Sequence, residues 1–461
     1  MNIAATPVTG FDLEVQTLII GAGACGMVAA LAAREAGQEV LVIEADPVPR
    51  GSTALSAGLI PAAGTSFQAA AGIADDAALF AADIQRKAHD ENDPELVAAL
   101  ASGSGPAIDW LAARFGLPFS VVTDFDYPGH ARRRMHGLPT RSGAELVDRL
   151  RQTCETQGID IICERRATVL HHEGRVITGV TVTLPDGSTE AIGCARLILA
   201  CNGYGGNRAM VAQHMPAISD ALWFGHDGNR GEAVLWGAAL GAGTRHLGAY
   251  QGHGNVAHPH GILITWAVIT EGGVQVNLDG RRFWNEAQGY SEAARAVMGQ
   301  PQGQAWAVFD TRIAGVARQF ADFQAAEAQG AVKTAATVAE LAAVTGLPEA
   351  ALAETLAAIP QGGVDEFGRS FHTPPLTPPY AAVRVTGALF HTQGGLDVTG
   401  TGRVRHEDGT LFPNLHAAGG AACGVSGTAD SGYLSGNGLL SAVVLGRAAG
   451  MDWPAAADAA K

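Results

Sequence analysis

Residues 16–26 read QTLIIGAGACG, an apolar run that passes directly into three glycines. Residues 16–20 predict a short buried strand, and the alanine-rich stretch after the glycines predicts a helix. At this spacing Gly21 makes a tight turn, Gly23 lets the backbone approach a pyrophosphate, and Gly26 lets the helix pack closely on the strand. The N-terminus of the helix then faces the anion. The stretch therefore predicts an α/β domain that binds a dinucleotide.

A second apolar run, residues 40–43, ends in an acid, Glu44, 18 residues after Gly26. An acid at this place in such a domain binds a ribose hydroxyl. The alternative is a surface carboxylate that binds nothing. A nicotinamide-binding domain would continue with alternating strands and helices, whereas this chain continues with residues 50–58, RGSTALSAG. That departure favours FAD over NAD.

Length and charge limit the classes of protein to consider. With 461 residues the chain exceeds what one core usually organises, so we expect two domains, one of them possibly split in sequence by the other. Hydrophobic residues make up 47% and charged residues 16%, and 60 glycines are spread along the chain, as in a large α/β enzyme. The net charge of -15 argues against nucleic acid as a partner. The basic run Arg132–Arg134 is expected to be a solvated loop; the alternative is that it faces a phosphate or an acidic substrate.

Cysteine spacing and hydropathy bear on location. The six cysteines lie far apart without a CxxC pair, which is typical of reduced thiols in a cytosolic chain and predicts no metal site. No run approaches 18 uninterrupted apolar residues, and the first 15 residues have no basic region followed by a cleavage site. We therefore expect a cytoplasmic protein that does not span a membrane.

Four segments resemble the FAD-binding segments of the fumarate reductase and 3-ketosteroid dehydrogenase superfamily. They are residues 51–58 (GSTALSAG), 197–207 (LILACNGYGGN), 415–420 (LHAAGG) and 435–440 (SGNGLL), in the order expected for that family. The last is a glycine-rich turn that opens a helix, whose amides can meet the carbonyl edge of a flavin. The resemblance implies non-covalent FAD, because no histidine lies in residues 51–58, where relatives with covalent FAD carry one. The expected FAD-binding residues are Gly21, Gly23, Ala24, Cys25, Gly26, Glu44, Ala45, Gly51, Ser52, Thr53, Ser56, Ala57, Gly58, Ala200, Asn202, Gly203, Gly419, Gly420, Gly438, Leu439 and Leu440.

The resemblance also implies a domain order. In that family both ends of the chain build a Rossmann-type FAD-binding domain, and the middle forms an inserted α+β capping domain that covers the substrate. We expect the FAD-binding domain at residues 1–251 and 390–461 and the capping domain at 252–389. Glycine- and proline-rich breakers flank the insert, and residues 334–359 within it show two helical patterns.

The charges that a fumarate reductase needs are missing. In that family the proton-donating arginine lies four residues after an Arg-Phe-x-Asn-Glu motif; here the motif is residues 282–286 and the position is Tyr290. The arginine that grips a carboxylate is replaced by Tyr433, and the acid and arginine of the proton relay are replaced by Trp266 and Ile269. Two desolvated carboxylates would then lack cationic partners, so reduction of a dicarboxylate is not expected.

The two tyrosines resemble those of the 3-ketosteroid Δ1-dehydrogenases. That resemblance implies that Tyr290 removes the proton α to a ketone and that Tyr433, aided by an amide near Gly436, stabilises the developing enolate oxygen. An ordinary phenol titrates near pH ~10, so the base needs a hydrogen-bonded neighbour. Tyr127, in the loop of residues 124–129, resembles the family's third tyrosine and is the candidate. The alternative is that these tyrosines only pack.

His391 complicates the assignment to a ketone dehydrogenase. Residues 391–395 (HTQGG) resemble the fumarate reductase segment whose histidine binds substrate. His391 could orient a substrate carbonyl or carboxylate, or be a neutral structural residue. Gly436 and Trp266 are further expected substrate contacts.

The expected reaction is desaturation of a cyclic ketone. The chain is short for a steroid dehydrogenase, which suggests a smaller ring such as a cyclohexanone or an oxocyclohexanecarboxylate. No second nucleotide fingerprint is visible, so a quinone, O2 or a redox protein is expected as electron acceptor. The alternatives are an ene-reductase of an unsaturated acid or enone, with Tyr290 as proton donor, and a flavin-binding sensor without catalysis.

Overall fold

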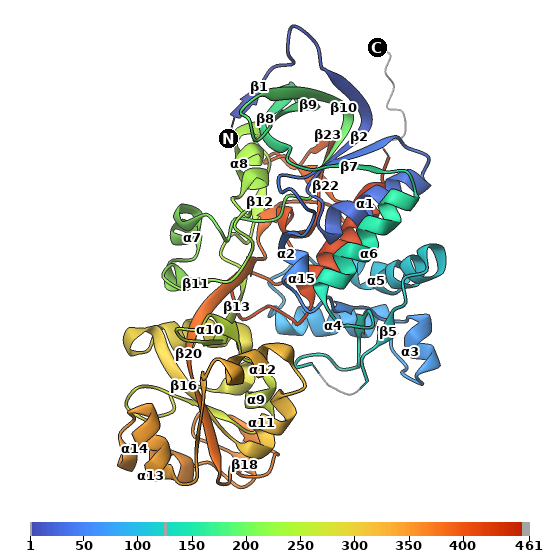
Figure 1. Ribbon diagram of the computed structural model, residues 1–461. Coiled ribbons are helices and arrows are strands. Elements are labelled where there is room, and N and C mark those ends of the chain that lie inside the picture. Colours follow the sequence, from blue (N-terminus) through green and yellow to red (C-terminus); the bar gives the residue numbers. More distant parts are fainter. Residues whose placement is uncertain (1, 124–126, 454–461) are drawn as a thin grey trace. The chain divides into compact units, whose positions relative to one another are not determined.

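The computed structural model describes residues 2–123 and 127–453, and Figure 1 colours them along the sequence. They divide into two units, which are described separately. The first unit contains the chain up to Met210, the segment Gly225–Tyr250, and the chain from His391 onward. The second unit contains Val211–Phe224 and Gln251–Phe390.

One segment falls in a different unit from the one expected. The sequence-based division assigned Val211–Phe224 to the FAD-binding domain, whereas the structure groups it with the second unit. The reason is a strand pairing: β11 (Leu222–Trp223) pairs in parallel with β20 (Tyr380–Thr392).

The first unit is built on a large mixed sheet. Strand β2 (Leu13–Ile20) runs parallel to both of its neighbours, β10 (Thr189–Leu199) and β3 (Val40–Ile43). The last four residues of β2 and all of β3 are buried, which explains the apolar runs at residues 18–20 and 40–43. The strands expected at residues 16–20 and 40–43 are confirmed. The other strands of this sheet are β1 (Asn2–Ala4), β7 (Asp160–Ile162), β8 (Arg166–Glu173), β9 (Val176–Thr183), β22 (Arg403–Arg405) and β23 (Leu411–Ala417).

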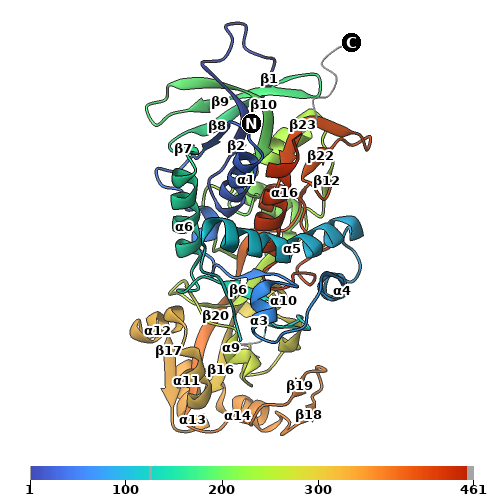
Figure 2. The same ribbon diagram turned by 90° about the vertical axis from the view of Figure 1, so that its right-hand side faces the viewer.

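The expected helix after the glycine motif is confirmed as α1 (Ala24–Glu35), whose first ten residues are buried. It packs against α16 (Gly446–Met451), and Figure 2 shows the two side by side. It also packs against α6 (Gly143–Thr156). Segments from both ends of the chain therefore build one layer of the first unit.

By its length and composition, helix α5 (Pro94–Phe115) could cross a membrane. It is the one helix among the described residues that meets these two criteria. Half of its apolar window is buried inside the protein. Leu100, Ile108 and Leu111 belong to the core of the first unit. A core helix of a water-soluble enzyme has the same properties, so α5 is weak evidence for a membrane span.

The second unit is an α+β insert around its own sheet. Strand β20 (Tyr380–Thr392) pairs antiparallel with β16 (Gln304–Asp310), and the sheet order is β14-β13-β20-β16-β15. The two helices expected within residues 334–359 are confirmed as α13 (Val338–Thr345) and α14 (Glu349–Ala357). The remaining elements that matter here are β13 (Tyr250–Ala257), β14 (Ile262–Leu263), β15 (Val274–Val276), β17 (Val332–Ala335), α9 (Ala267–Thr270), α10 (Tyr290–Met298), α11 (Thr311–Ala317) and α12 (Ala321–Ala328).

The expectation of a solvated basic loop is wrong for one of its three arginines. Arg132 is exposed, but Arg134 is 1% exposed and forms a two-pronged ion pair with Asp75, with N···O distances of 2.7 and 2.9 Å. Its guanidinium also pairs with Asp83. Arg134 is therefore buried together with two carboxylates, because a buried charge is tolerated only when it is paired.

Candidate active site

The glycine motif forms a cradle of bare backbone at the start of α1. Gly21 has a φ of +105°, and a Cβ there would lie 2.6 Å from the carbonyl oxygen of Ala200. A Cβ on Gly26 would lie 1.8 Å from the carbonyl oxygen of Gly21. Since neither site has room for a side chain, only glycine preserves this turn, which leaves the N-terminus of α1 open to an anion.

Glu44 is fixed at the end of β3 by the same turn. Its Oε2 accepts a hydrogen bond from the Ala22 amide at 2.8 Å, and its Oε1 accepts one from the Asp46 amide at 3.0 Å. A carboxylate has about four lone-pair sites, so each oxygen keeps capacity for a further donor. The half-buried carboxylate fits the hydroxyls of a ribose.

The segment after β3 joins this cradle through side chains. Thr53 Oγ1 accepts a hydrogen bond from the Ala24 amide at 3.1 Å. Ser52 Oγ accepts from the side-chain amides of Asn202, at 2.8 Å, and Asn229, at 2.9 Å. The structure thus brings three expected segments together, and Asn229 is a member that no sequence motif indicated.

The C-terminal segment packs on the same cradle. A Cβ on Gly420 would lie 2.1 Å from Asn202 Oδ1, and one on Gly203 would lie 1.8 Å from Thr392 Oγ1. Gly419 lies against Cys25, since a Cβ there would be 3.2 Å from the thiol sulfur. The resulting surface has little side-chain bulk and many backbone groups. Those properties fit FAD.

Some expected cofactor residues also contact another part of the first unit. Ser56 lies against Gly143 at the start of α6: the Gly143 amide donates to the Ser56 carbonyl at 2.8 Å. A Cβ on Gly58 would lie 2.7 Å from the Ser142 carbonyl. These two residues hold α6 against the loop, and their part in cofactor binding stays a prediction, as does that of their neighbour Ala57. Leu439 and Leu440 lie in α15 (Asn437–Leu440).

His391 and Tyr433 lie together in the first unit. Their rings meet edge-to-face with centroids 5.5 Å apart. Burial raises the pKa of the Tyr433 phenol, and hydrogen bonds from the Gly438 and Gly436 backbones partly offset this. Burial lowers the pKa of His391 to about 4, so its imidazole is neutral at pH 7. At pH 7 these two side chains are therefore neutral hydrogen-bonding groups.

Tyr290 begins α10 in the second unit and is half-buried there. It stacks on His253, with centroids 5.0 Å apart and planes 19° apart. Trp266, which is 7% exposed, meets the Tyr290 ring edge-on at 6.4 Å and packs toward Trp284 in the core of this unit. His253 is a neighbour of Tyr290 that the sequence interpretation missed, because nothing in the motif of residues 282–286 points to it.

Tyr127 is half-buried in the first unit. Residues 124–126 of its loop lie outside the described part of the chain. Because Tyr127 and Tyr290 belong to different units, the expected hydrogen bond between them stays a prediction.

The Arg-Phe-x-Asn-Glu motif is a structural anchor for Tyr290. Arg282 reaches both carboxylate oxygens of Glu286, at 3.0 and 2.5 Å, and also pairs with Asp365. Arg369 binds the same Glu286 carboxylate at 3.1 Å. All four side chains are at most 7% exposed. The network fixes the turn from which α10 and Tyr290 start.

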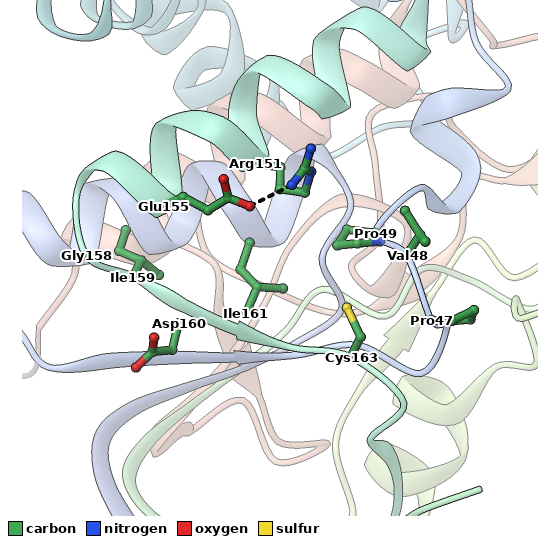
Figure 3. Close-up of a pocket in the computed structure, with 10 residues that line it drawn as sticks. All are labelled: Pro47, Val48, Pro49, Arg151, Glu155, Gly158, Ile159, Asp160, Ile161 and Cys163. Carbon is green, nitrogen blue, oxygen red and sulfur yellow. Dashed lines mark hydrogen bonds and ion pairs between the residues drawn. The ribbon is translucent and has the colours of Figure 1, made fainter.

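Figure 3 shows a surface pocket of about 490 Å³ on the first unit, between α6, β7 and residues 47–49. Among its lining residues are Cys163 and an ion pair of 2.6 Å between Arg151 and Glu155. Burial raises the pKa of the Cys163 thiol, which disfavours a reactive thiolate. None of the expected catalytic or cofactor residues lines it, so this pocket is separate from the candidate active site. Within the described residues no cluster of metal-ligating side chains is present.

Comparisons with known proteins agree with this geometry. A sequence family described as FAD binding domain matches residues 16–439. A probable fumarate reductase from Shewanella frigidimarina (strain NCIMB 400) is 32% identical over 445 residues, which cover 94% of this chain and 74% of that protein.

Solved structures of two kinds match the fold. The open conformation of a flavocytochrome c3 fumarate reductase superposes with a TM-score of 0.81 at 30% identity, over 96% of this chain and 78% of that chain. The 3-ketosteroid-Δ4-(5α)-dehydrogenase from Rhodococcus jostii RHA1, in complex with 4-androstene-3,17-dione, superposes with a TM-score of 0.78 at 26% identity, over 98% of this chain and 99% of that chain. The expected α/β fold class is confirmed.

Proposed function

Because this chain belongs to the FAD binding domain family, together with fumarate reductases and 3-ketosteroid dehydrogenases, we propose that it desaturates a cyclic ketone between its α and β carbons. The chain is an FAD-dependent oxidoreductase that acts on carbon–carbon bonds. One observation carries the finer proposal: tyrosines, at positions 290 and 433, replace the arginines that a dicarboxylate would need.

Different residues of the chain have different roles in the proposed reaction. Gly21, Gly26, Glu44 and Ser52 would hold FAD, which when bound would supply the acceptor for the substrate's β-hydride. Tyr433 donates a hydrogen bond to the ketone oxygen and stabilises its charge as the α-proton leaves.

Tyr290 is the proposed base for the α-proton. Its stacking partner His253 is neutral, because burial lowers the pKa of that imidazole to about 3. His253 therefore fixes the plane of the phenol without adding charge. Tyr127 is the proposed hydrogen-bonding partner that makes the phenol a stronger base.

Chain length does not decide the size of the ring. The R. jostii steroid dehydrogenase is covered over 99% of its length, so a chain of this size is compatible with a steroid. The smaller rings expected from the sequence, cyclohexanones and oxocyclohexanecarboxylates, therefore stand beside steroid ketones in the proposal. The proposed acceptor for the electrons is a quinone, O2 or a redox protein, and the proposed location is the cytoplasm.

A reductase is the second candidate. The likeness to the S. frigidimarina fumarate reductase favours it, as does His391 in a segment typical of such enzymes. The same residues serve either direction, with Tyr290 as proton donor to an enone or unsaturated acid. The missing arginines argue against a dicarboxylate as its substrate.

Anaerobic flavin bleaching separates the two. The purified yellow protein is mixed with saturated cyclohexanones, oxocyclohexanecarboxylates and steroid ketones, and the absorbance near ~450 nm is followed. Bleaching by one of these ketones supports desaturation and gives the substrate class. If no saturated compound bleaches the flavin, and an enone or unsaturated acid reoxidises the chemically reduced protein, the proposed direction is wrong.

A further inference from the structure

A chain of hydrogen bonds ends on His391. Asn437 Nδ2 donates to Ser426 Oγ at 3.0 Å, and Ser426 Oγ donates to Gln393 Oε1 at 2.7 Å. The other end of that amide, Gln393 Nε2, lies 3.1 Å from His391 Nδ1. Ser426 and Asn437 are each 1% exposed and Gln393 is 6% exposed, whereas His391 is half-buried. The chain therefore runs from the interior of the first unit to the half-buried His391.

The direction of the chain fixes the proton on His391. Because Ser426 Oγ accepts from Asn437, its own hydrogen is free for Gln393 Oε1. The amide nitrogen of Gln393 then faces His391 Nδ1 as a donor, and two N–H groups cannot face each other. Nδ1 is thus the acceptor, and a neutral imidazole carries its proton on Nε2. The Thr392 carbonyl, which would favour a proton on Nδ1, lies farther away at 3.3 Å.

The imidazole is also held in place by its neighbours. A Cβ on Gly438 would lie 3.0 Å from His391 Cε1, so the ring sits against the bare backbone of α15. The ring of Tyr433 meets it edge-to-face, with planes 73° apart. Among the described residues Nε2 has no hydrogen-bonding partner. A fixed N–H group next to Tyr433 is therefore available to a ligand.

We propose that Gln393, held by Ser426 and Asn437, is a positioning residue that keeps His391 as the neutral Nε2–H tautomer, a donor to an uncharged carbonyl oxygen of the substrate. This deepens the proposed function and rests on it. A neutral donor suits a ketone, whereas a carboxylate is bound best by a charged one. His391 and Tyr433 then act as two neutral donors in the first unit. The inferred substrate is therefore a simple ketone in preference to a keto acid.

The tautomer is measured directly on the holoenzyme. The protein is labelled with ¹⁵N-histidine, and long-range ¹H–¹⁵N NMR spectra separate Nδ1–H from Nε2–H imidazoles. The His391 signals are those lost in His391→Asn. The expected wild-type pattern is a protonated Nε2 and a bare Nδ1. A protonated Nδ1, which a reversed chain of hydrogen bonds would give, overturns the inference.

An isosteric variant tests the part of Gln393. In Gln393→Glu the carboxylate can only accept, so it draws the proton to Nδ1, and the His391 signals should change to the Nδ1–H or doubly protonated pattern. The matched control is Gln38→Glu, a buried glutamine that binds Thr17 and Arg196 and should leave the His391 signals unchanged. Unchanged His391 signals in Gln393→Glu overturn the role of Gln393.

Ligand binding separates this inference from the proposed function. The rate of anaerobic flavin bleaching by cyclohexanone should reach half its maximum at a roughly tenfold higher cyclohexanone concentration in Gln393→Glu than in wild type, about 1.4 kcal/mol. Cyclohexanecarboxylate should bind wild type more weakly than cyclohexanone does. A wild-type Nε2–H pattern without binding of any cyclic ketone overturns the substrate class and the proposed function while leaving the tautomer intact.

Discussion

His253 lies flat against Tyr290, with ring centroids 5.0 Å apart, and its Nδ1 accepts a hydrogen bond from the Asn255 amide at 3.2 Å. That amide leaves the proton of the neutral imidazole on Nε2. His253 also stacks on Phe390, with ring centroids 5.5 Å apart, and Phe390 in turn stacks on Phe224 at 4.8 Å. The phenol therefore belongs to an aromatic cluster of the second unit that sets its plane, which is what a base needs if its oxygen is to meet one particular C–H bond.

The first prediction concerns the hydroxyl of Tyr290. Tyr290→Phe keeps the stack on His253 but removes the base, so the rate of flavin bleaching by a saturated ketone should fall at least ~100-fold. Flavin content and the visible spectrum should not change. Tyr380→Phe, at the start of β20 in the same unit, is the control and should bleach at the wild-type rate. A Tyr290→Phe protein that bleaches at full rate would show that this tyrosine only packs.

The second prediction concerns the glycine cradle. A Cβ at Gly26 would lie 1.8 Å from the Gly21 carbonyl oxygen, so Gly26→Ala forces α1 away from β2. The purified protein should lose most of its FAD and unfold at a lower temperature. Gly315 in α11 is the matched control, because a Cβ there would meet nothing within 4 Å. Gly315→Ala should keep its FAD and gain up to about 1 kcal/mol from the higher helix propensity of alanine. Full FAD content in Gly26→Ala would contradict the packing argument.

Local patterns in the sequence predict local structure well here. The strands β2 and β3 and the helix α1 follow from apolar runs and a fixed glycine spacing, all within about thirty residues of chain. The helices α13 and α14 follow from their 3.6-residue period in the same way.

Contacts between distant segments escape such reasoning. Asn229 binds Ser52 across 177 positions, and Arg134 leaves the solvated loop expected for it because Asp75, 59 positions away, lies in its reach. Gln393 is close to His391 in sequence, yet its role depends on Ser426 and Asn437. In each case a side-chain pairing made by the tertiary fold decides the residue's role, and no periodicity encodes it.

The third prediction concerns the network beneath Tyr290. Glu286→Gln leaves Arg282 and Arg369 buried with one carboxylate fewer, and breaking such a network costs about 3 kcal/mol. Denaturant unfolding should show an earlier transition for the second unit. The control is Glu354→Gln, which breaks an ion pair with Arg281 whose side chains are 52% and 64% exposed. That change should cost at most about 0.5 kcal/mol. If the two variants lose the same free energy of unfolding, burial of the network does not increase the contribution of Glu286 to stability.

The last prediction concerns acid stability. Asp83 is buried and accepts hydrogen bonds from Arg134, from the Ala131 amide at 2.7 Å and from Arg86 at 2.5 Å. Burial alone would raise the pKa of this carboxyl, but the bonds from Arg134, Ala131 and Arg86 outweigh it and hold the pKa below its ordinary value. A depressed carboxyl pKa stabilises the folded state above the unfolded pKa of ~3.9 and loses that contribution as the pH falls through the folded pKa.

Asp83→Asn should therefore lower the urea midpoint of the first unit at pH 7, and the gap from wild type should narrow as the pH falls below ~4. Asp279→Asn, an exposed aspartate after β15, is the control and should differ little from wild type at any pH. Urea titrations at a series of pH values measure the difference in urea midpoint between each variant and wild type. Unfolding is monitored by flavin release and by circular dichroism. A gap for Asp83→Asn that stays constant from neutral to acidic pH would mean that the loss comes from packing. The ion pair between Asp83 and Arg134 would then contribute nothing to the stability of this unit through the charge of Asp83.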